Sequence, residues 1–163
     1  MKEGSPILVY RLIEAESIDV LRPLWEKLRG YHAPWLERFP GEQPPYNFTP
    51  RKAGLLAKAA QGHLRIELVR GTGDPTDIAY CVTTVTADGR GEVDSMFVDE
   101  SFRGHGIGTE LLRRALAWCD AVGAVSKSVS VAYENREALA LYQRFGFHPR
   151  VLQLQQHLPG PKG

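Results

Sequence analysis

Cysteine is nearly absent from this sequence: two thiols in 163 residues cannot form the dense disulfide framework of a small secreted domain. Both of them, Cys81 and Cys119, lie in apolar segments that suit buried, reduced thiols. Long hydrophobic runs are also missing, since no stretch approaches the ~20 apolar residues of a membrane-spanning helix. Near the N-terminus, Arg11, Glu14 and Glu16 interrupt the apolar core that a secretory signal would need. We therefore expect a cytoplasmic protein with no membrane partner.

Neither sign of charge is in excess, because 20 basic and 19 acidic side chains give a formal net charge of +1. This balance gives no reason to expect nucleic acid as a partner, so any anion site must be local. The five histidines have no metal-ligand spacing, and we expect no metal. Hydrophobic residues make up 43% of the chain, which is enough for one core. Because no repeat or linker divides the chain, residues 1–163 are expected to form a single domain.

The first half of the chain predicts a strand, a helix, a loop, a second helix and then a run of strands. Ile7–Ile13 is rich in branched residues and predicts a strand, and the apolar positions after it predict a helix ending at Gly30. Residues 33–50 contain too many prolines for regular structure and predict a long loop with four aromatic residues, Trp35, Phe39, Tyr46 and Phe48. The remaining patterns predict a helix over 50–60 and strands over 63–70, 78–86 and 92–98, the last two forming a hairpin.

The second half of the chain alternates between strands and helices. After strand 92–98, the apolar positions predict a helix over 106–122, a strand over 128–132 and a helix over 135–145. Strands joined by a crossover helix are normally parallel and right-handed. We therefore expect the antiparallel strands of the first half to continue into one parallel pair within a single mixed sheet.

A glycine-rich loop, Arg103-Gly104-His105-Gly106-Ile107-Gly108-Thr109, joins strand 92–98 to the helix that follows. Glycines allow positive φ and close approach to a ligand, while the free N–H groups and the dipole of a helix N-terminus attract an anion. A phosphate or pyrophosphate is therefore the expected ligand. The phosphate-binding loop of nucleotide hydrolases is excluded because Gly-Lys-Ser/Thr is absent, and the dinucleotide fingerprint fails because its third glycine comes one residue early. The pattern that fits is Arg-x-x-Gly-x-Gly, formed by Arg103, Gly106 and Gly108.

Two longer motifs include or follow this loop. The first is the segment VDSMFVDESFRGHGIGTELLRRAL, and the second is N-x-x-A-x-x-L-Y-x-x-F-G-F, formed by Asn135, Ala138, Leu141, Tyr142, Phe145, Gly146 and Phe147. Both resemble the GNAT superfamily of acyl-CoA N-acyltransferases. The resemblance implies an α/β (α+β) fold with a central mixed, mostly antiparallel twisted sheet, about four flanking helices, and a splayed pair of parallel strands that forms the coenzyme groove. After Pro149 there is room for one strand, where the family often has two.

The resemblance implies acetyl-CoA as a co-substrate and assigns its contacts. Its pyrophosphate is expected on the backbone N–H groups of Arg103, Gly104, His105, Gly106, Gly108 and Thr109. Glu110 is expected to face solvent, because its charge would repel a phosphate if it faced inward. Asn135 is expected to cap the last helix and to share one groove with Tyr142, which lies about 10 Å further along the same helical face.

Strand 92–98 is expected to hold the reactive end of the coenzyme. In the family a bulge, here near Ser95 and Met96, separates this strand from its parallel neighbour and leaves an edge free for the pantetheine arm. The resemblance therefore assigns backbone contacts to Phe97 and Val98. The N–H group of Phe97 would also stabilise the oxyanion that forms when an amine attacks the thioester.

The resemblance also implies the catalytic groups. Tyr142 is expected to donate a proton to the departing thiolate, although the residue pattern alone favours a half-buried aromatic that packs beside Ala138 and Phe145. An alkylamine is mostly protonated at neutral pH and needs a base; Glu92 matches the base of the histone-acetylating branch, and Asp94 lies on the same strand face. Both could instead be ordinary solvent-facing residues. Cys119 is expected to be a structural thiol, because no histidine lies nearby in sequence to activate it.

Together these inferences predict direct transfer of an acetyl group from acetyl-CoA to a primary amine of a small molecule or peptide, by a monomer or a homodimer. Two other classes stay open: an acyl-CoA-binding sensor that has lost catalysis, and a nucleotide-binding regulator. No motif identifies the acceptor. Trp35, Tyr46 and Phe48 could line an amine pocket or could pack on the core.

Overall fold

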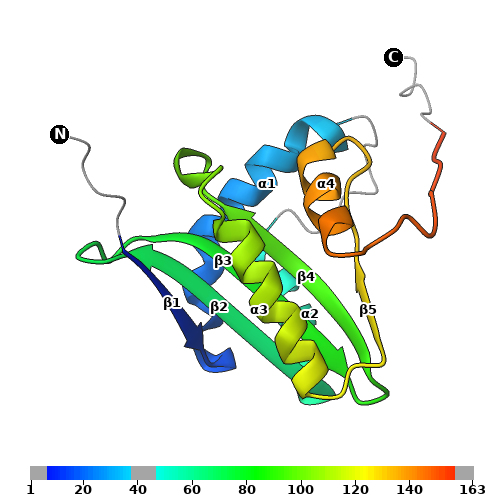
Figure 1. Ribbon diagram of the computed structural model, residues 1–163, viewed down its shortest axis with the longest axis horizontal. Helices are drawn as coiled ribbons and strands as arrows, with labels where there is room; N and C mark the ends of the chain where they lie inside the picture. Colours follow the sequence, from blue (N-terminus) through cyan, green and yellow to red (C-terminus); the bar gives the residue numbers. More distant parts are fainter. Residues whose placement is uncertain (1–6, 38–46, 157–163) are drawn as a thin grey trace.

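The computed structural model describes residues 7–37 and 47–156. A five-stranded sheet forms its centre, with the strands in the order β1-β2-β3-β4-β5 (Figure 1). The strands are β1 (Leu8–Ile13), β2 (Gly62–Gly71), β3 (Asp77–Thr86), β4 (Arg90–Val98) and β5 (Ser126–Val129). The helices are α1 (Arg22–Leu36), α2 (Phe48–Ala60), α3 (Ile107–Ala121) and α4 (Arg136–Arg144), with 3-10 turns over Ala15–Leu21 and Glu100–Phe102.

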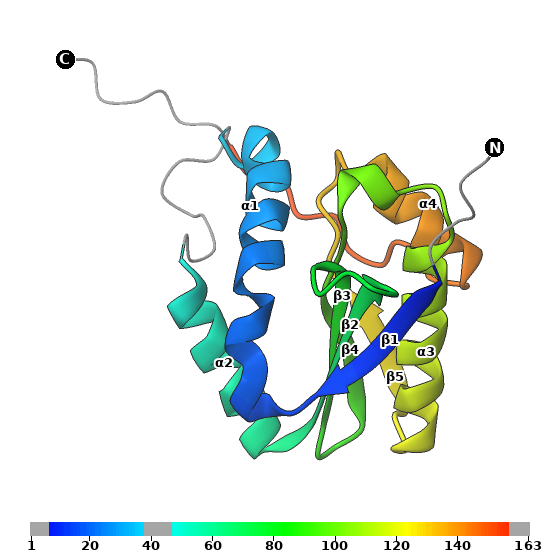
Figure 2. The ribbon, with the colours of Figure 1, turned by 90° about the vertical axis from the view of Figure 1, so that its left-hand side faces the viewer.

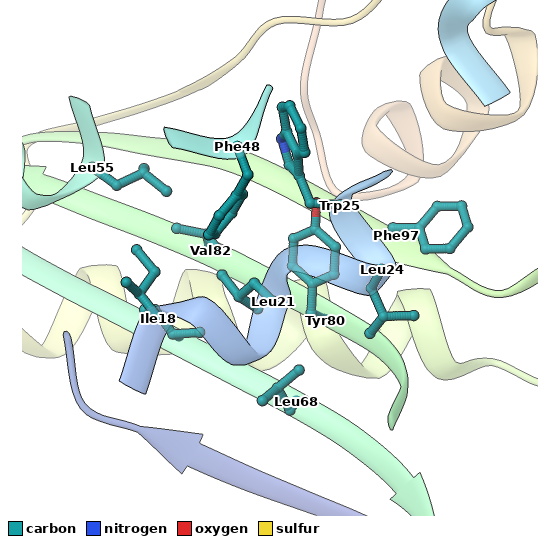
Figure 3. Close-up of a cluster of buried hydrophobic side chains, with 11 residues drawn as sticks. Ile18, Leu21, Leu24, Trp25, Phe48, Leu55, Leu68, Tyr80, Val82 and Phe97 are labelled. Carbon is teal, nitrogen blue, oxygen red and sulfur yellow. The ribbon is translucent and has the colours of Figure 1, made fainter. Parts of the chain in front are cut away.

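Helices cover both faces of the sheet, which gives the protein two hydrophobic cores. Figure 2 shows α1 and α2 on one face, with α3 and α4 on the other. The core under α1 and α2 joins residues such as Leu21, Leu24 and Trp25 to Leu68, Tyr80 and Val82 of the sheet (Figure 3). The core under α3 and α4 contains Val69, Ala79, Cys81, Val93, Leu111, Leu112 and Tyr142. Strand β3 is buried on both faces from Ile78 to Val85, and this stretch is apolar except for Thr83 and Thr84.

Pairing within the sheet confirms the predicted change from antiparallel to parallel strands. Strands β1 to β4 pair antiparallel with their neighbours, and β4 pairs parallel with β5 after the crossover through α3. The parallel pair is short: it runs from Arg90 opposite Ser126 to Val93 opposite Val129. Strand β4 continues to Val98, so its last five residues extend beyond the end of β5. The predicted splayed pair of strands is therefore present.

A bulge in β4 lies at Asp94, one residue before the predicted position at Ser95 and Met96. In the ladder with β3, Val82 is opposite Ser95 while Thr83 is opposite Val93, which leaves Asp94 as an extra residue. The extra residue resets the alternation of the strand. Ser95 consequently faces α1 and α2, where its hydroxyl oxygen lies 2.5 Å from that of Tyr80.

Helix α1 is longer than predicted, because it passes through Gly30 and Pro34 and ends at Leu36. The predicted loop over 33–50 is wrong at both ends, since α2 begins at Phe48. Two of the aromatic residues assigned to that loop, Phe39 and Tyr46, lie outside the described residues. A helical glycine costs about 1 kcal/mol relative to alanine. Beyond Gly30, Tyr31 packs against the core under α1 and α2, and this contact explains why the helix continues.

The other corrections concern the second half of the chain. Strand β5 covers Ser126–Val129, two residues earlier than predicted, and Ala132 lies outside it. The described residues up to 156 contain no strand after β5, so the predicted C-terminal strand is absent from that range. In place of a strand, an irregular segment exposes Val151, Leu152 and Leu154. Among the described residues, no helix has both the length and the apolar character needed to cross a membrane.

Candidate functional site

A cavity of about 430 Å³ opens where the end of β4, the glycine loop (residues 103–109), α1 and α4 meet. The loop contributes Arg103, Gly104, Gly106, Ile107, Gly108 and Thr109 to its lining. Strand β4 contributes Met96, Phe97 and Val98, and α4 contributes Glu137, Ala138, Leu141 and Arg144, with Asn135 just before that helix. On the remaining side, α1 contributes Leu28, Tyr31 and His32. Segments that are far apart in the sequence therefore share one lining.

The glycine loop has the backbone conformation that the glycines predict. Gly104 and Gly106 both have a φ of 78°, in the left-handed region that disfavours residues with a Cβ atom. Gly106 is the N-cap of α3, so the first N–H groups of that helix begin at the cavity. His105 differs from the other predicted loop contacts because it does not line the cavity; its Nδ1 lies 2.9 Å from the carbonyl oxygen of Arg103.

Glu110 faces away from the cavity, as predicted, and its side chain, which is 31% exposed, belongs to an ion-pair cluster. Its carboxylate accepts hydrogen bonds from the guanidinium groups of Arg113 at 2.7 Å and Arg114 at 2.8 Å. Hydrogen bonds from Arg113 and Arg114 lower the pKa of Glu110 to about 2. The carboxylate is therefore charged but locally neutralised, and it is not part of the cavity lining. An anion at the glycine loop would meet little repulsion from it.

The Arg103 side chain folds back from the loop onto α1 and β4. Its guanidinium carbon lies 4.4 Å from the ring centroid of Tyr31 and 5.4 Å from that of Phe97. Its Nε donates a hydrogen bond of 2.9 Å to the carbonyl oxygen of Val98. Cation–π contacts of this kind are worth about 0.5–2 kcal/mol. The side chain thus joins the loop, the end of β4 and α1 around the cavity.

The two predicted residues around α4 have different environments. The Asn135 side chain caps the helix by accepting a hydrogen bond of 3.1 Å from the Ala138 N–H, and the residue lines the cavity. Tyr142 does not line the cavity: it is only 6% exposed and packs edge-on against Phe147. Burial is the main cause of a raised pKa for Tyr142, and Cys81 adds to it. The phenol therefore keeps its proton at neutral pH.

The predicted carboxylates of β4 face α2 and share one cation. Glu92 Oε2 lies 2.7 Å from Lys58 Nζ, and the same nitrogen donates to Asp94, whose side chain is only 1% exposed. Thr84 also donates to Asp94, at 2.6 Å. Burial alone would lower the pKa of Lys58, but its hydrogen bonds to Asp94 and Glu92 raise it overall. Neither carboxylate lines the cavity.

The α1 wall was missed by the sequence analysis because the helix was predicted to end at Gly30. Tyr31 and His32 follow that glycine and line the cavity, and Trp35 packs on Tyr31 with ring centroids 5.2 Å apart. A prediction that continued α1 for two more turns would have placed Tyr31 and Trp35 on the same side of the helix, with His32 beside them. Phe48, by contrast, is a core residue, 3% exposed and in contact with Trp25.

The two cysteines are free and buried, as expected. Burial raises the pKa of Cys81 to about 12 and also raises that of Cys119. Thiols with raised pKa values are poor nucleophiles at neutral pH, which agrees with a structural role. Among the residues that the structure describes, no group of three or more metal-binding side chains comes together.

Comparison with known proteins identifies the family. The sequence profile of the Acetyltransferase (GNAT) family matches residues 24–147. The chain belongs to this family. A GNAT-family relative, an aminoglycoside N(6')-acetyltransferase type 1 of Acinetobacter genomosp. 13, is 29% identical over 115 residues, 69% of this chain and 67% of that protein. An uncharacterized N-acetyltransferase of Methanocaldococcus jannaschii is 37% identical over 59 residues, 36% of this chain and 26% of that protein.

Solved structures show the same GNAT fold. A mutant of the BH1408 protein from Bacillus halodurans superposes with a TM-score of 0.70 at 15% identity, covering 93% of this chain and 99% of that one. The aminoglycoside N-acetyltransferase AAC(6')-Iy, solved in complex with CoA, gives a TM-score of 0.63 at 17% identity and covers 97% of this chain and 100% of that one. The chain matches only about a quarter to a third of the length of the first curated relatives, 26% and 31%.

Proposed function

We propose that residues 1–163 form a single acetyl-CoA-dependent N-acetyltransferase domain. The substrate is a primary amine of a small molecule or peptide, which attacks the thioester directly in a ternary complex. The observation that carries this proposal is the glycine loop, whose left-handed glycines and helix N-terminus line a cavity beside the splayed end of β4. Free N–H groups at a helix N-terminus are suited to a pyrophosphate. Such a protein can act as a monomer or a homodimer in the reducing cytoplasm, where Cys81 and Cys119 stay free.

The cavity lining supports the assignment of coenzyme contacts. Backbone N–H groups from Arg103 to Thr109 would hold the pyrophosphate, with His105 at the exposed outer side of the loop. The pantetheine arm would run along β4 beyond Val93, where pairing with β5 has ended, and would meet Phe97 and Val98. Asn135 would contact it from the α4 side. The uncovered edge of β4 offers the backbone groups that such an arm needs.

Tyr142 is the proposed proton donor to the coenzyme sulfur. The amine nitrogen forms a bond to the acetyl carbon, the C–S bond breaks, and the thiolate takes the phenolic proton. Burial keeps the Tyr142 hydroxyl protonated over the physiological pH range, but it also makes this phenol a weaker acid than an exposed one, so the transfer needs a strongly basic thiolate beside it. The Phe97 N–H group is proposed to stabilise the oxyanion that forms during the attack.

Glu92, with Asp94 behind it, is the proposed carboxylate base. The two carboxylates already hold one primary ammonium group, that of Lys58, and this contact supports their proposed role beside an acceptor amine. An acceptor amine would have to displace Lys58 from Glu92, the more exposed of the two, whose side chain is 40% exposed. The pair would attract the ammonium of the acceptor as it attracts that of Lys58.

A thiol-release assay with a panel of amines tests the proposed function. Because two of the relatives are aminoglycoside N-acetyltransferases, the panel should include aminoglycosides beside small amines, polyamines and peptide N-termini. For an amine that is turned over, Tyr142→Phe should lower kcat by about 10–100-fold while the KM for acetyl-CoA changes little. Tyr133→Phe is the matched control, since that phenol is 60% exposed.

Three outcomes would contradict parts of this proposal. Calorimetric binding of acetyl-CoA without turnover of any amine would favour the catalytically silent sensor. Thermal stabilisation by ATP or NAD but not by coenzyme A would favour the nucleotide-binding regulator. A rate unaffected by both Tyr142→Phe and Glu92→Gln would remove the roles assigned to those side chains.

A further inference from the structure

The wall of the cavity opposite the glycine loop carries an imidazole. Leu28, Tyr31 and His32 of α1 form this wall, and the His32 ring packs beside Trp35 with ring centroids 5.5 Å apart. The guanidinium of Arg103 lies against both Tyr31 and Phe97, so this part of α1 approaches β4 at the residue proposed to hold the oxyanion. His32 therefore lines the same space as the proposed reaction centre.

The charges around His32 are mainly positive. Arg29 lies one turn earlier on α1, and Arg103 reaches across from the glycine loop. From the opposite wall, α4 contributes Arg144 and the carboxylate of Glu137. Burial, and after it the charge of Arg29, lower the pKa of His32 below its ordinary value of 6.5. The imidazole is consequently neutral at pH 7 and can accept a proton.

The ring nitrogens of His32 have no hydrogen-bond partner among residues 7–37 and 47–156. Within these residues the His32 ring also forms no ion pair, and it packs against the rings of Tyr31 and Trp35. Glu92 and Asp94 differ from His32 in two ways: both carboxylates accept hydrogen bonds from Lys58, and neither lines the cavity. Among the described side chains that line the cavity, Glu137 carries the one carboxylate, and it lies in the first turn of α4.

We propose that His32 removes the proton that the acceptor amine carries when it enters the cavity. This inference rests on the proposed function and adds a second route for that proton. One imidazole nitrogen takes a proton from the ammonium and later releases it to solvent. The neutral amine attacks the acetyl carbon, the C–S bond breaks, and the sulfur takes the proton of Tyr142. The amine nitrogen, now bonded to the acetyl carbon, then loses a second proton to the Tyr142 phenolate, which restores the phenol. In sum, an ammonium ion and acetyl-CoA give an amide, a free thiol and one proton.

The test compares His32→Gln and His32→Asn with the wild type over pH 6.5–9.5, using an amine that the wild type acetylates. At pH 7 we expect kcat/KM for the amine to fall by about 100-fold, the usual size of a general-base contribution. The deficit should shrink steadily as the pH rises, because the free amine then forms without a base. His63→Gln is the matched control: it removes an exposed histidine of β2, outside the cavity.

Each outcome of this experiment supports or contradicts the proposed role of His32. A deficit that is the same at every pH would assign His32 a packing role and overturn the inference, as would kcat/KM within twofold of the wild type. A normal His32→Gln together with an inactive Glu92→Gln would place the base on the carboxylates instead. Thermal unfolding shows whether His32→Gln is folded, and His32→Asn serves if it is not. Absence of turnover by the wild type would overturn the proposed function and this inference together, whereas a loss confined to the His32 variants would support both.

Discussion

The substitution Gly108→Ala asks whether the glycine loop is shaped by its ligand or by the fold. Gly108 is the second residue of α3 and lines the cavity, and it is not one of the glycines with positive φ. A Cβ atom there would lie 3.7 Å from Leu141 Cδ2 and 3.7 Å from Val98 Cγ2, which is ordinary van der Waals contact. The fold therefore accepts an alanine, and only a ligand that approaches the backbone closely would not.

Gly108→Ala is expected to raise the stability of the free protein and to weaken its binding of acetyl-CoA. A compatible Gly→Ala substitution stabilises a protein by about 0.4–1 kcal/mol, which for a chain of this size raises Tm by up to about 4 °C. Loss of close approach to the pyrophosphate should weaken acetyl-CoA binding at least ~10-fold, about 1.4 kcal/mol. At a ligand concentration 100 times the wild-type Kd, the ligand adds about 2.7 kcal/mol to the stability of the wild type, but only about 1.4 kcal/mol to that of the variant.

Thermal unfolding with and without CoA, together with calorimetric titration, measures both quantities. Gly54→Ala is the control, since Gly54 is an exposed glycine within α2 and has open space around its Cβ position. It should show the same gain in Tm and no loss of CoA affinity. If Gly108→Ala bound CoA as tightly as Gly54→Ala does, the coenzyme would not contact the backbone of the loop closely, and the pyrophosphate assignment would be wrong.

Two further predictions concern charged groups. Lys58→Met leaves the buried Asp94 carboxylate beside Glu92 without its cation and should lower the free energy of unfolding by about 1–3 kcal/mol, whereas Lys52→Met, which breaks an exposed pair, should stay within about 0.5 kcal/mol. An equal loss in both variants, measured by urea unfolding, would contradict this difference. Because the folded pKa of Glu110 lies below its ordinary value of 4.5, the stability from its arginine pairs is present above pH 4.5 and disappears as the pH falls toward 2. The Tm difference between wild type and Glu110→Gln should therefore shrink on acidification; a constant difference would show that the pairs contribute nothing.

Local sequence patterns predicted the parts of the fold in which burial decides the structure. The largely apolar stretch of β3 and the apolar stripe of α3 gave both elements nearly in full, because β3 is buried on both faces and the buried positions of α3 recur at the period of a helix. Helix α1 was cut short because Gly30 and Pro34 disfavour helix in isolation. Its continuation depends on contacts with distant residues, such as that of the Tyr31 ring with the guanidinium of Arg103, which no local pattern reveals.

The candidate site divides in the same way. The glycine loop and the Asn135 cap could be predicted because the residues that form them are contiguous in sequence. The cation on the carboxylates could not, since Lys58 is separated from Glu92 by 34 positions. His32 also carried no local signal, because its place in the cavity depends on how α1 crosses the end of β4.

The extra residue in β4, Asp94, determines which face of the sheet each later side chain of the strand occupies. Val93 and Met96 belong to the core beneath α3, although they are three positions apart, while Phe97 belongs to the core beneath α1. A regular strand of the same sequence, paired without the bulge, would exchange the occupants of the two cores: Phe97 would move to the α3 side and Val98 to the α1 side. The composition of the strand would be unchanged, yet Phe97 and the α1 wall would no longer meet. The bulge at Asp94 thus decides which side chains the end of β4 presents to each core.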